Sequence, residues 1–309
     1  MVAAAEIFGA RALVSTTDRV TRMANRTGQT ASTPRIAVAL GPRSMPEARR
    51  LLAAAAACQA DLVELRLDYF REPFDLAALL HECPCPVIIT NRSSQEGGHW
   101  QGDEAARLAP LLEAMRLGAE HVDIEAVSIS SLADVPRPHT RLIVSTHDFT
   151  HTPDDLWAIH QRLAGLGGDV VKVVSMARRL GDSLRMLEVL ARAEVPTIAL
   201  AMGEHGLVTR VLALRHPACY LTFAALNGEQ GTAPGQVSLS TMREVFQAQT
   251  LSPQTKVFGT LGPDGGDVEE WAQKIRLLRA AGQDAVYVPL KTAQDDNVAA
   301  VLKLLLRLG

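Results

Sequence analysis

The stretch Val170-Val171-Lys172-Val173-Val174-Ser175-Met176 is a short apolar run interrupted by one lysine. β-Branched residues on both sides of Lys172 are typical of a strand that is buried in a sheet. Seven similar runs occur along the chain, so the segment is one member of a repeating pattern. The eight predicted strands are Arg35–Leu40, Asp61–Leu67, Pro86–Thr90, His121–Glu125, Arg141–Thr146, Asp169–Val174, Thr197–Ala201 and Cys219–Phe223.

Helical patterns separate most of these strands. Strands that alternate with helices pair in parallel, and eight such repeats over roughly 210 residues match the size of a (β/α)8 TIM barrel. A doubly wound open sheet is the alternative, but the first strand leads into Gly41-Pro42-Arg43-Ser44 without a G-x-G-x-x-G turn. We therefore predict an α/β fold with a barrel over residues 35–250. Apolar spacings of three and four indicate helices at Pro46–Ala57, Glu104–Leu117, Asp154–Ala164, Asp182–Ala193 and Leu207–Leu214.

The two ends of the chain differ from the barrel. Residues 1–34 are rich in Ala, Thr and Arg, and we expect a disordered N-terminal extension. A cleaved organellar leader, or a gene start placed too early with Met23 as the true start, are alternatives. Residues 256–309 predict a short α/β appendage of strand, helix, strand and helix, with Asp267, Glu269 and Glu270 opening the first helix and Gly282 ending it.

Composition narrows the class of protein. Hydrophobic content of 47%, charged content of 21% and a net charge of −3 are typical of a globular protein and do not indicate binding to nucleic acid or an anionic membrane. The longest apolar clusters, such as Leu51–Cys58, are too short to span a bilayer. The four cysteines are expected to be reduced, and Cys83-Pro84-Cys85 lacks the second ligand pair of a structural zinc site. We expect a cytoplasmic protein.

Reactive residues follow the predicted strands, where a barrel places its active site. Burial disfavours a charged ammonium group, so a buried lysine such as Lys172 is suited to act as the nucleophilic amine of a Schiff base. His147 follows the fifth strand and is suited to general acid and base catalysis. The ordinary explanations are a lysine paired with a buried carboxylate and a structural histidine. Glu64, Arg66 and Asp68 share one face of the second strand, either as a ligand site or as a structural charge ladder.

These groups suit one class of reaction. An imine between Lys172 and a ketone acidifies the neighbouring C–H bond, His147 removes that proton, and a group β to the carbonyl leaves. Arginine side chains bind a carboxylate with two hydrogen bonds.

Seven motifs occur in order along the chain: Glu64-x-Arg66-x-Asp68, Arg92-Ser93-x-x-Glu96-Gly97-Gly98, Val122-Asp123-x-Glu125, Ser145-x-His147-Asp148-Phe149, Val171-Lys172-Val173, Met202-Gly203-x-x-Gly206-x-x-x-Arg210 and Ala233-Pro234-Gly235-Gln236. They resemble those of type I 3-dehydroquinate dehydratase, a lyase of the shikimate pathway that needs no metal or organic cofactor. The resemblance implies that Lys172 forms the Schiff base, that His147 is the general acid and base, and that Glu96 orients His147. It further implies a small-molecule substrate, 3-dehydroquinate, and a homodimer. The implied substrate-binding residues are Glu64, Arg66, Arg92, Met202, Arg210, Phe223, Thr232 and Gln236.

The C-terminal segment looks like the start of a shikimate dehydrogenase substrate domain, on the residues Lys256-Val257-Phe258-Gly259-Thr260-Leu261-Gly262-Pro263. Asp264-Gly265-Gly266-Asp267 replaces the Ser-x-Ser-Pro motif of that family, and about 54 residues cannot build the whole enzyme. We therefore expect a truncated segment without dehydrogenase activity that is dispensable for the dehydratase.

Two other functions compete with this interpretation. A class I aldolase-like lyase shares the barrel and the imine, but His147 and the loop that carries Gln236 argue against it. An inactive relative that serves as a binding module is the second alternative, and the intact set of Lys172, His147 and Arg210 argues against that one.

Overall fold

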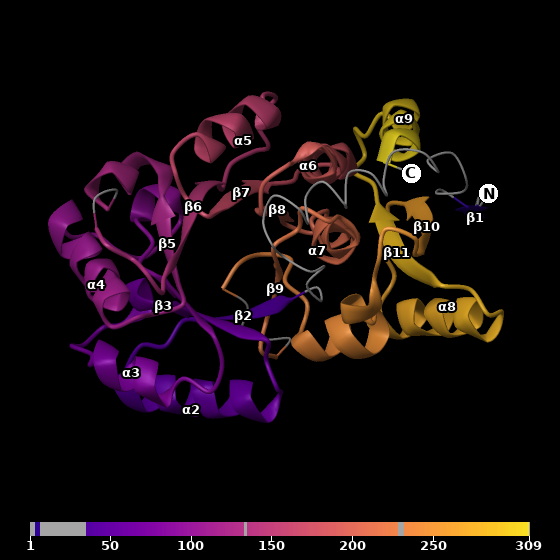
Figure 1. Ribbon diagram of the computed structural model, residues 1–309. Helices are drawn as coiled ribbons and strands as arrows, with labels where there is room; N and C mark the ends of the chain where they lie inside the picture. The colour runs from indigo at the N-terminus through magenta and orange to yellow at the C-terminus, as the bar shows by residue number, and fades with distance from the viewer. Residues whose placement is uncertain (1–3, 7–34, 133–134, 228–231, 309) are drawn as a thin grey trace.

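The computed structural model describes residues 4–6, 35–132, 135–227 and 232–308. Eight strands form one sheet in the order β8-β7-β6-β5-β4-β3-β2-β9, and every neighbouring pair is parallel. A bridge between Thr197 and Cys219 joins β8 to the chain just before β9 and closes the barrel. The predicted TIM barrel is confirmed (Figure 1). Its strands are β2 (Ile36–Leu40), β3 (Leu62–Arg66), β4 (Val87–Thr90), β5 (His121–Glu125), β6 (Arg141–Asp148), β7 (Val170–Met176), β8 (Thr197–Met202) and β9 (Thr222–Ala224).

Helices follow most of the strands and surround them (Figure 1). Three of them begin at a side chain that caps the first turn, since Ser44, Asp75 and Asp103 accept hydrogen bonds from backbone amides. The helices are α2 (Met45–Ala57), α3 (Leu76–Glu82), α4 (Glu104–Arg116), α5 (Leu156–Ala164), α6 (Leu180–Arg192) and α7 (Leu207–Leu212). Short helical turns are η1 (Leu67–Tyr69), η2 (Ser94–Glu96), η3 (Ala126–Ser131), η4 (Ala213–Arg215), the π-helical η5 (Thr241–Val245) and η6 (Ala248–Thr250).

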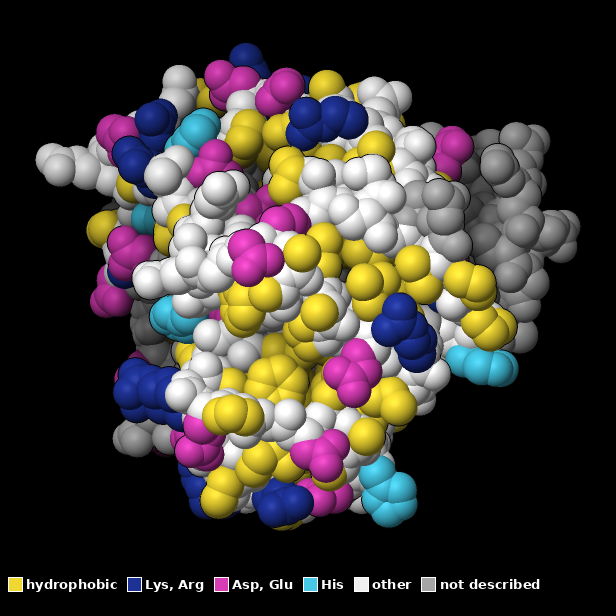
Figure 2. All heavy atoms as spheres, turned by 90° about the vertical axis from the view of Figure 1, so that its left-hand side faces the viewer, with side chains coloured by type: hydrophobic (Ala, Val, Ile, Leu, Met, Phe, Trp, Pro, Cys, Tyr) yellow, Lys and Arg dark blue, Asp and Glu magenta, His cyan; other side chains and the backbone are white. Residues whose placement is uncertain are grey.

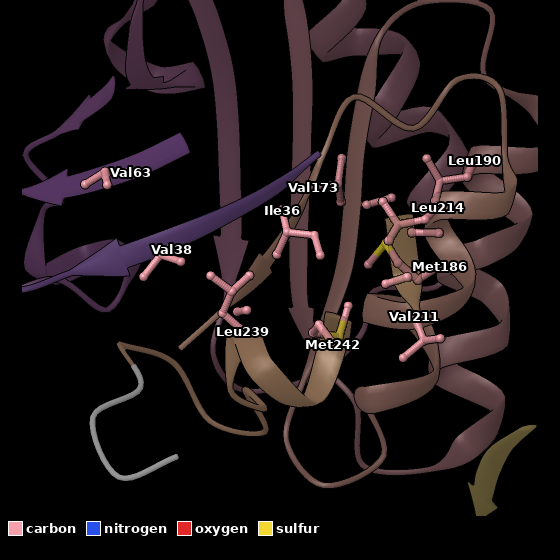
Figure 3. Close-up of a cluster of buried hydrophobic side chains, with 14 of the residues drawn as sticks. Ile36, Val38, Val63, Val173, Met186, Leu190, Val211, Leu214, Leu239 and Met242 are labelled. Carbon is pink, nitrogen blue, oxygen red and sulfur yellow. The ribbon is translucent and has the colours of Figure 1, made fainter. Parts of the chain in front are cut away.

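Strand alternation divides the apolar residues into two clusters. The larger cluster fills the layer between strands and helices, where Val38, Val173 and Met186 are examples (Figure 3). The smaller cluster contains Ile88, Ile143 and Ile198, which belong to the alternate set of strand positions and therefore face the barrel interior. Along β7, Val170 is followed on this inner face by Lys172. Apolar side chains thus fill the lower part of the barrel interior, and polar side chains line its upper part, toward the carboxyl ends of the strands.

The appendage has the predicted order of elements: β10 (Lys256–Gly262), α8 (Val268–Ala280), β11 (Ala285–Lys291) and α9 (Val298–Leu308). β10 and β11 pair in parallel, Asp267 caps α8, and Gly282 has a φ of 69° just after α8 ends. Three residues of the predicted N-terminal extension form β1 (Ala4–Glu6), which pairs antiparallel with β10. The rest of residues 1–34 lies outside the described residues, so the domain boundaries remain predictions.

The surface mixes charges of both signs with apolar side chains on the face that Figure 2 presents. Among the described residues, no helix combines the length and the apolarity that crossing a membrane requires.

Candidate active site

A cavity opens at the carboxyl ends of the barrel strands and encloses about 510 Å³ of empty space, part of it open to solvent. Every residue predicted for the site lines it, although the residues come from eight separate parts of the chain. They are Glu64, Arg66, Arg92, Glu96, His147, Lys172, Met202, Arg210, Phe223, Thr232 and Gln236. The cavity therefore brings together the predicted nucleophile, the predicted proton carrier and the predicted substrate contacts.

Lys172 lies deep in the barrel, with 4% of its surface exposed. Its Nζ donates hydrogen bonds to Asp123 Oδ2 at 2.8 Å and to Glu64 Oε1 at 3.2 Å. The same nitrogen lies 4.6 Å from the ring centroid of Phe223. Two carboxylates and an aromatic face thus fix the direction of the amine.

Asp123 on β5 is the main residue to which the sequence assigned no role. Its Oδ1 accepts hydrogen bonds from Arg92 Nη2 at 2.7 Å and from Ser145 Oγ at 2.6 Å. Burial alone raises the pKa of Asp123, but Arg92 and Lys172 outweigh it and hold the pKa well below the ordinary value. A permanent carboxylate therefore faces the lysine nitrogen. The motif Val122-Asp123-x-Glu125 was the one feature of the sequence that could have indicated a role for Asp123.

His147 is held by Glu96, whose Oε2 lies 2.9 Å from Nδ1. Because an ionised carboxylate only accepts, Nδ1 carries the hydrogen and Nε2 keeps a lone pair. Burial, followed by the charges of Arg92 and Lys172, lowers the pKa of His147 well below its ordinary value. Burial raises the pKa of Glu96 to about 7, partly offset by Arg92. His147 is therefore a neutral imidazole near neutral pH, which is the form that can act as a base.

Arg210 on α7 is a buried cation, with 2% of its surface exposed. Its Nη1 and Nη2 make long contacts to the carbonyl oxygens of Phe223 at 3.5 Å and Pro234 at 3.4 Å. Its Nε has no hydrogen-bond partner among the described residues, and no carboxylate there pairs with it. Burial lowers its pKa to about 10. An unpaired buried guanidinium is suited to bind an anion from solution.

The charged residues Glu64, Arg66 and Asp68, at the end of β3 and the start of η1, have different roles. Glu64 reaches Lys172 and also accepts a hydrogen bond from Thr90 Oγ1 at 2.9 Å. Arg66 forms two hydrogen bonds with Asp68, at 2.8 and 2.7 Å, so Asp68 holds Arg66 rather than lining the cavity. Glu64 and Arg66 therefore face the cavity, whereas Asp68 is a structural partner of Arg66.

Five lining residues were not predicted: Gly97, Phe149, Val174, Leu200 and Ala233. Val174 lies two residues after Lys172 and Leu200 two before Met202, so strand alternation places both on the inner face. Gly97 has a φ of 74°, and a Cβ there would lie 2.3 Å from the Phe149 ring. Within the described part of the chain, no group of three or more His, Cys, Asp or Glu side chains is arranged to hold a metal ion.

Comparison with known proteins identifies the family of this chain. The family model described as "Type I 3-dehydroquinase" matches residues 36–253, which is more than half of the chain. The chain belongs to the type I 3-dehydroquinase family. It is therefore a lyase of the 3-dehydroquinate dehydratase type, and its barrel is the part that carries the family's sequence.

Relatives of this dehydratase family differ in length. A 3-dehydroquinate dehydratase of Desulfotalea psychrophila is 35% identical over 69% of this chain and 96% of its own length. A chloroplastic bifunctional 3-dehydroquinate dehydratase/shikimate dehydrogenase of Arabidopsis thaliana is 34% identical over 79% of this chain. The match covers only 41% of the length of that relative. The crystal structure of 3-dehydroquinate dehydratase from Geobacillus kaustophilus matches 68% of this chain and 89% of its own, with 30% identity and a TM-score of 0.60.

Proposed function

We propose that the chain converts 3-dehydroquinate to 3-dehydroshikimate and water through an imine on Lys172, with His147 as the general acid and base. The observation that carries the proposal is the cavity that holds Lys172 together with Arg210, a buried cation that no described carboxylate neutralises. A substrate with both a ketone and a carboxylate meets both groups at once.

The reaction begins when Lys172 Nζ attacks the ketone carbon and the carbonyl oxygen leaves as water. The protonated imine then carries a positive charge next to the Asp123 carboxylate, 2.8 Å from the present position of Nζ. Because Asp123 and Lys172 are both buried, this carboxylate stabilises the charge more strongly than it would in water.

Proton transfer follows at the carbon beside the imine. His147 Nε2 removes a proton from that carbon, and the electrons form an enamine with the imine nitrogen. The hydroxyl group at the β position then leaves with the proton that His147 returns to it, which gives water. Hydrolysis of the imine consumes one water and frees Lys172, so the net reaction releases one water. Glu96 keeps Nε2 directed at the substrate through its contact with Nδ1.

Arg210 supplies the carboxylate site in this proposal. Glu64, Arg66, Arg92, Thr232 and Gln236 would bind hydroxyl groups, while Met202 and Phe223 would pack on the substrate ring. The family resemblance further suggests a homodimer in the cytoplasm. Light scattering tests the dimer, since the monomer has a mass of 33.3 kDa.

A turnover assay tests the proposal. The full chain is mixed with 3-dehydroquinate, and the absorbance of the conjugated enone product is followed. We expect a steady rise in absorbance, and we expect Arg210→Met to raise KM by roughly 10- to 100-fold, the scale of hydrogen bonds to a charged group. A folded chain that produces no enone would refute the activity. An unchanged KM in Arg210→Met would refute the role of Arg210.

A further inference from the structure

The loop between β8 and α7 separates two cavities. On one side, Met202 lines the substrate cavity. On the other side, Glu204 and His205 line a second cavity with about 610 Å³ of empty space, whose opposite wall belongs to the appendage. The appendage residues in this wall are Asp264, Gly265, Gly266, Trp271, Pro289 and Lys291. Polar contacts join the loop to the appendage beside this cavity, part of which is open to solvent.

Those contacts join the loop to the end of β11. His205 Nδ1 donates to the backbone oxygen of Lys291 at 2.9 Å, and Lys291 Nζ donates to Glu204 Oε2 at 2.6 Å. His205 is 6% exposed, whereas the side chains of the ion pair are 34% and 63% exposed. The hydrogen bond of His205 is therefore the stronger constraint, because exposed ion pairs contribute little.

The same loop touches the segment that completes the substrate cavity. Gly203 donates its backbone N–H to the oxygen of Pro234 at 3.3 Å. A Cβ on Gly235 would lie 2.2 Å from the oxygen of Gly203, so the two backbones are in direct contact. The oxygen of Pro234 also accepts from Arg210 Nη2. A shift of Gly203 therefore moves the segment Thr232–Gln236 and disturbs the surroundings of Arg210.

A second connection reaches the start of α6. Asp296 of the appendage accepts backbone hydrogen bonds from Leu180 at 3.1 Å and Gly181 at 3.5 Å. Just before this helix, Ala177 donates its N–H to the oxygen of Met202 at 3.0 Å. The appendage thus holds both segments that flank Met202.

We propose that the appendage positions the substrate-binding side of the barrel, with His205 as the positioning residue that transmits its contact to Gly203 and the segment Thr232–Gln236. The inference rests on the proposed function. The side chains of Lys172, His147 and Glu96 take no part in these contacts, because their hydrogen bonds go to one another or to Glu64 and Asp123. Loss of the His205 contact should therefore weaken substrate binding and leave the chemical step in place.

Two substitutions at one position test this inference. In His205→Asn the side-chain NH₂ group lies near the position of Nδ1 and can still donate a hydrogen bond to the backbone oxygen of Lys291. In His205→Gln the NH₂ group lies near the position of Nε2, so this hydrogen bond is lost. We expect His205→Gln to raise KM for 3-dehydroquinate by roughly three- to tenfold, the effect of one lost hydrogen bond, with kcat changed by less than about twofold. His205→Asn should stay close to the unmodified chain. Arg307→Ala is the control, because it removes an exposed contact between α9 and Glu188 of α6, outside this loop.

Hydrogen exchange gives a readout that does not depend on turnover. Peptides that cover Gly203–Gly206 and Thr232–Gln236 should exchange faster in His205→Gln than in His205→Asn, while Arg307→Ala leaves both unchanged. Equal KM values and equal exchange in the two His205 variants would overturn the inference. So would an equal rise of KM in Arg307→Ala, because the effect would then be a general loosening of the appendage. An inactive unmodified chain refutes the proposed function instead, and the exchange experiment still decides the role of His205.

Discussion

The barrel and the appendage use the same parallel arrangement of strands and helices, yet their lysines have different surroundings. Lys172 on β7 is 4% exposed and contacts two buried carboxylates. Lys291 ends β11, and its side chain is 34% exposed and pairs with the exposed Glu204. Eight strands whose ends converge surround Lys172 with buried carboxylates, whereas the two parallel strands of the appendage leave Lys291 at the edge of a cavity beside an exposed carboxylate. Closure of the sheet, rather than a lysine on a strand, creates the reactive environment.

The two regions also differ in how they bury apolar surface. The barrel fills its own interior, while the appendage depends on the barrel for cover. Its Val301 and Leu305 on α9 belong to the same hydrophobic cluster as residues of the barrel, and α9 packs along α6. Trp271 on α8 lies 5.7 Å from Phe246, ring centroid to ring centroid. We therefore expect one cooperative unit rather than two independent domains.

The largest contrast is expected between the two lysines. Lys172→Ala should lower kcat by about 10³-fold or more, because it removes the nucleophile. Lys291→Ala should keep kcat within about twofold, since an exposed ion pair contributes little. Enone formation measures both. Comparable losses in the two variants would mean that the comparison between barrel and appendage is wrong.

The histidines should separate chemistry from positioning. His147→Ala removes the proton carrier and should lower kcat by roughly 10²-fold or more, while borohydride still traps an imine. The substitution His205→Gln should change mainly KM. Steady-state kinetics and trapping of both variants check this division. Near-normal kcat in His147→Ala would show that another group carries the proton.

A third contrast concerns pH. Above its pKa of about 7, Glu96 is ionised and accepts the hydrogen of His147 Nδ1, and below that pH it is protonated and this arrangement is lost. Turnover should therefore fall as the pH decreases through about 7. Glu96→Gln should lower kcat by roughly tenfold or more and abolish this acidic limb. Glu204→Gln is the exposed control and should keep the profile. A limb that persists in Glu96→Gln would assign it to another group.

The smallest effect on turnover is expected in the core of the appendage. Leu305 is 1% exposed, and Leu305→Ala should lower the free energy of unfolding by about 2–5 kcal/mol. Leu306, at 75% exposure, is the neighbouring control, and its replacement by Ala should change this energy by less than about 0.5 kcal/mol. Calorimetry should give one transition for the full chain. A separate transition at lower temperature in Leu305→Ala would indicate that the appendage unfolds alone.

Local patterns in the sequence predicted most of the fold. Each barrel strand is a short apolar run, so all eight were found, although β6 and β7 extend to Asp148 and Met176, beyond their predicted ends. After β9 the barrel ends in the π-helical turn η5 and the short turn η6 rather than in an α-helix. α3 was not predicted, although Asp75 gave a capping signal.

Long-range contacts were harder to predict. The role of Asp123 depends on Lys172, 49 positions away in sequence, and apolar spacing contains no information about such a pair. The contact of His205 with Lys291 joins positions 86 residues apart. We expected a dispensable appendage because the sequence gives no sign of this contact. Packing of one unit against another produces no periodic pattern in the sequence. The motif resemblance named the remaining predicted residues, and the structure brings them together in the wall of one cavity, while their roles remain predictions.

Trapping of the imine tests the central claim most directly. Borohydride is added to the full chain in the presence and absence of 3-dehydroquinate, and the digested protein is analysed by mass spectrometry. The account predicts loss of activity only when substrate is present, with a reduced adduct on the peptide that contains Lys172 and none on the peptide that contains Lys291. An adduct on another lysine, or full activity after borohydride treatment with substrate, would contradict it.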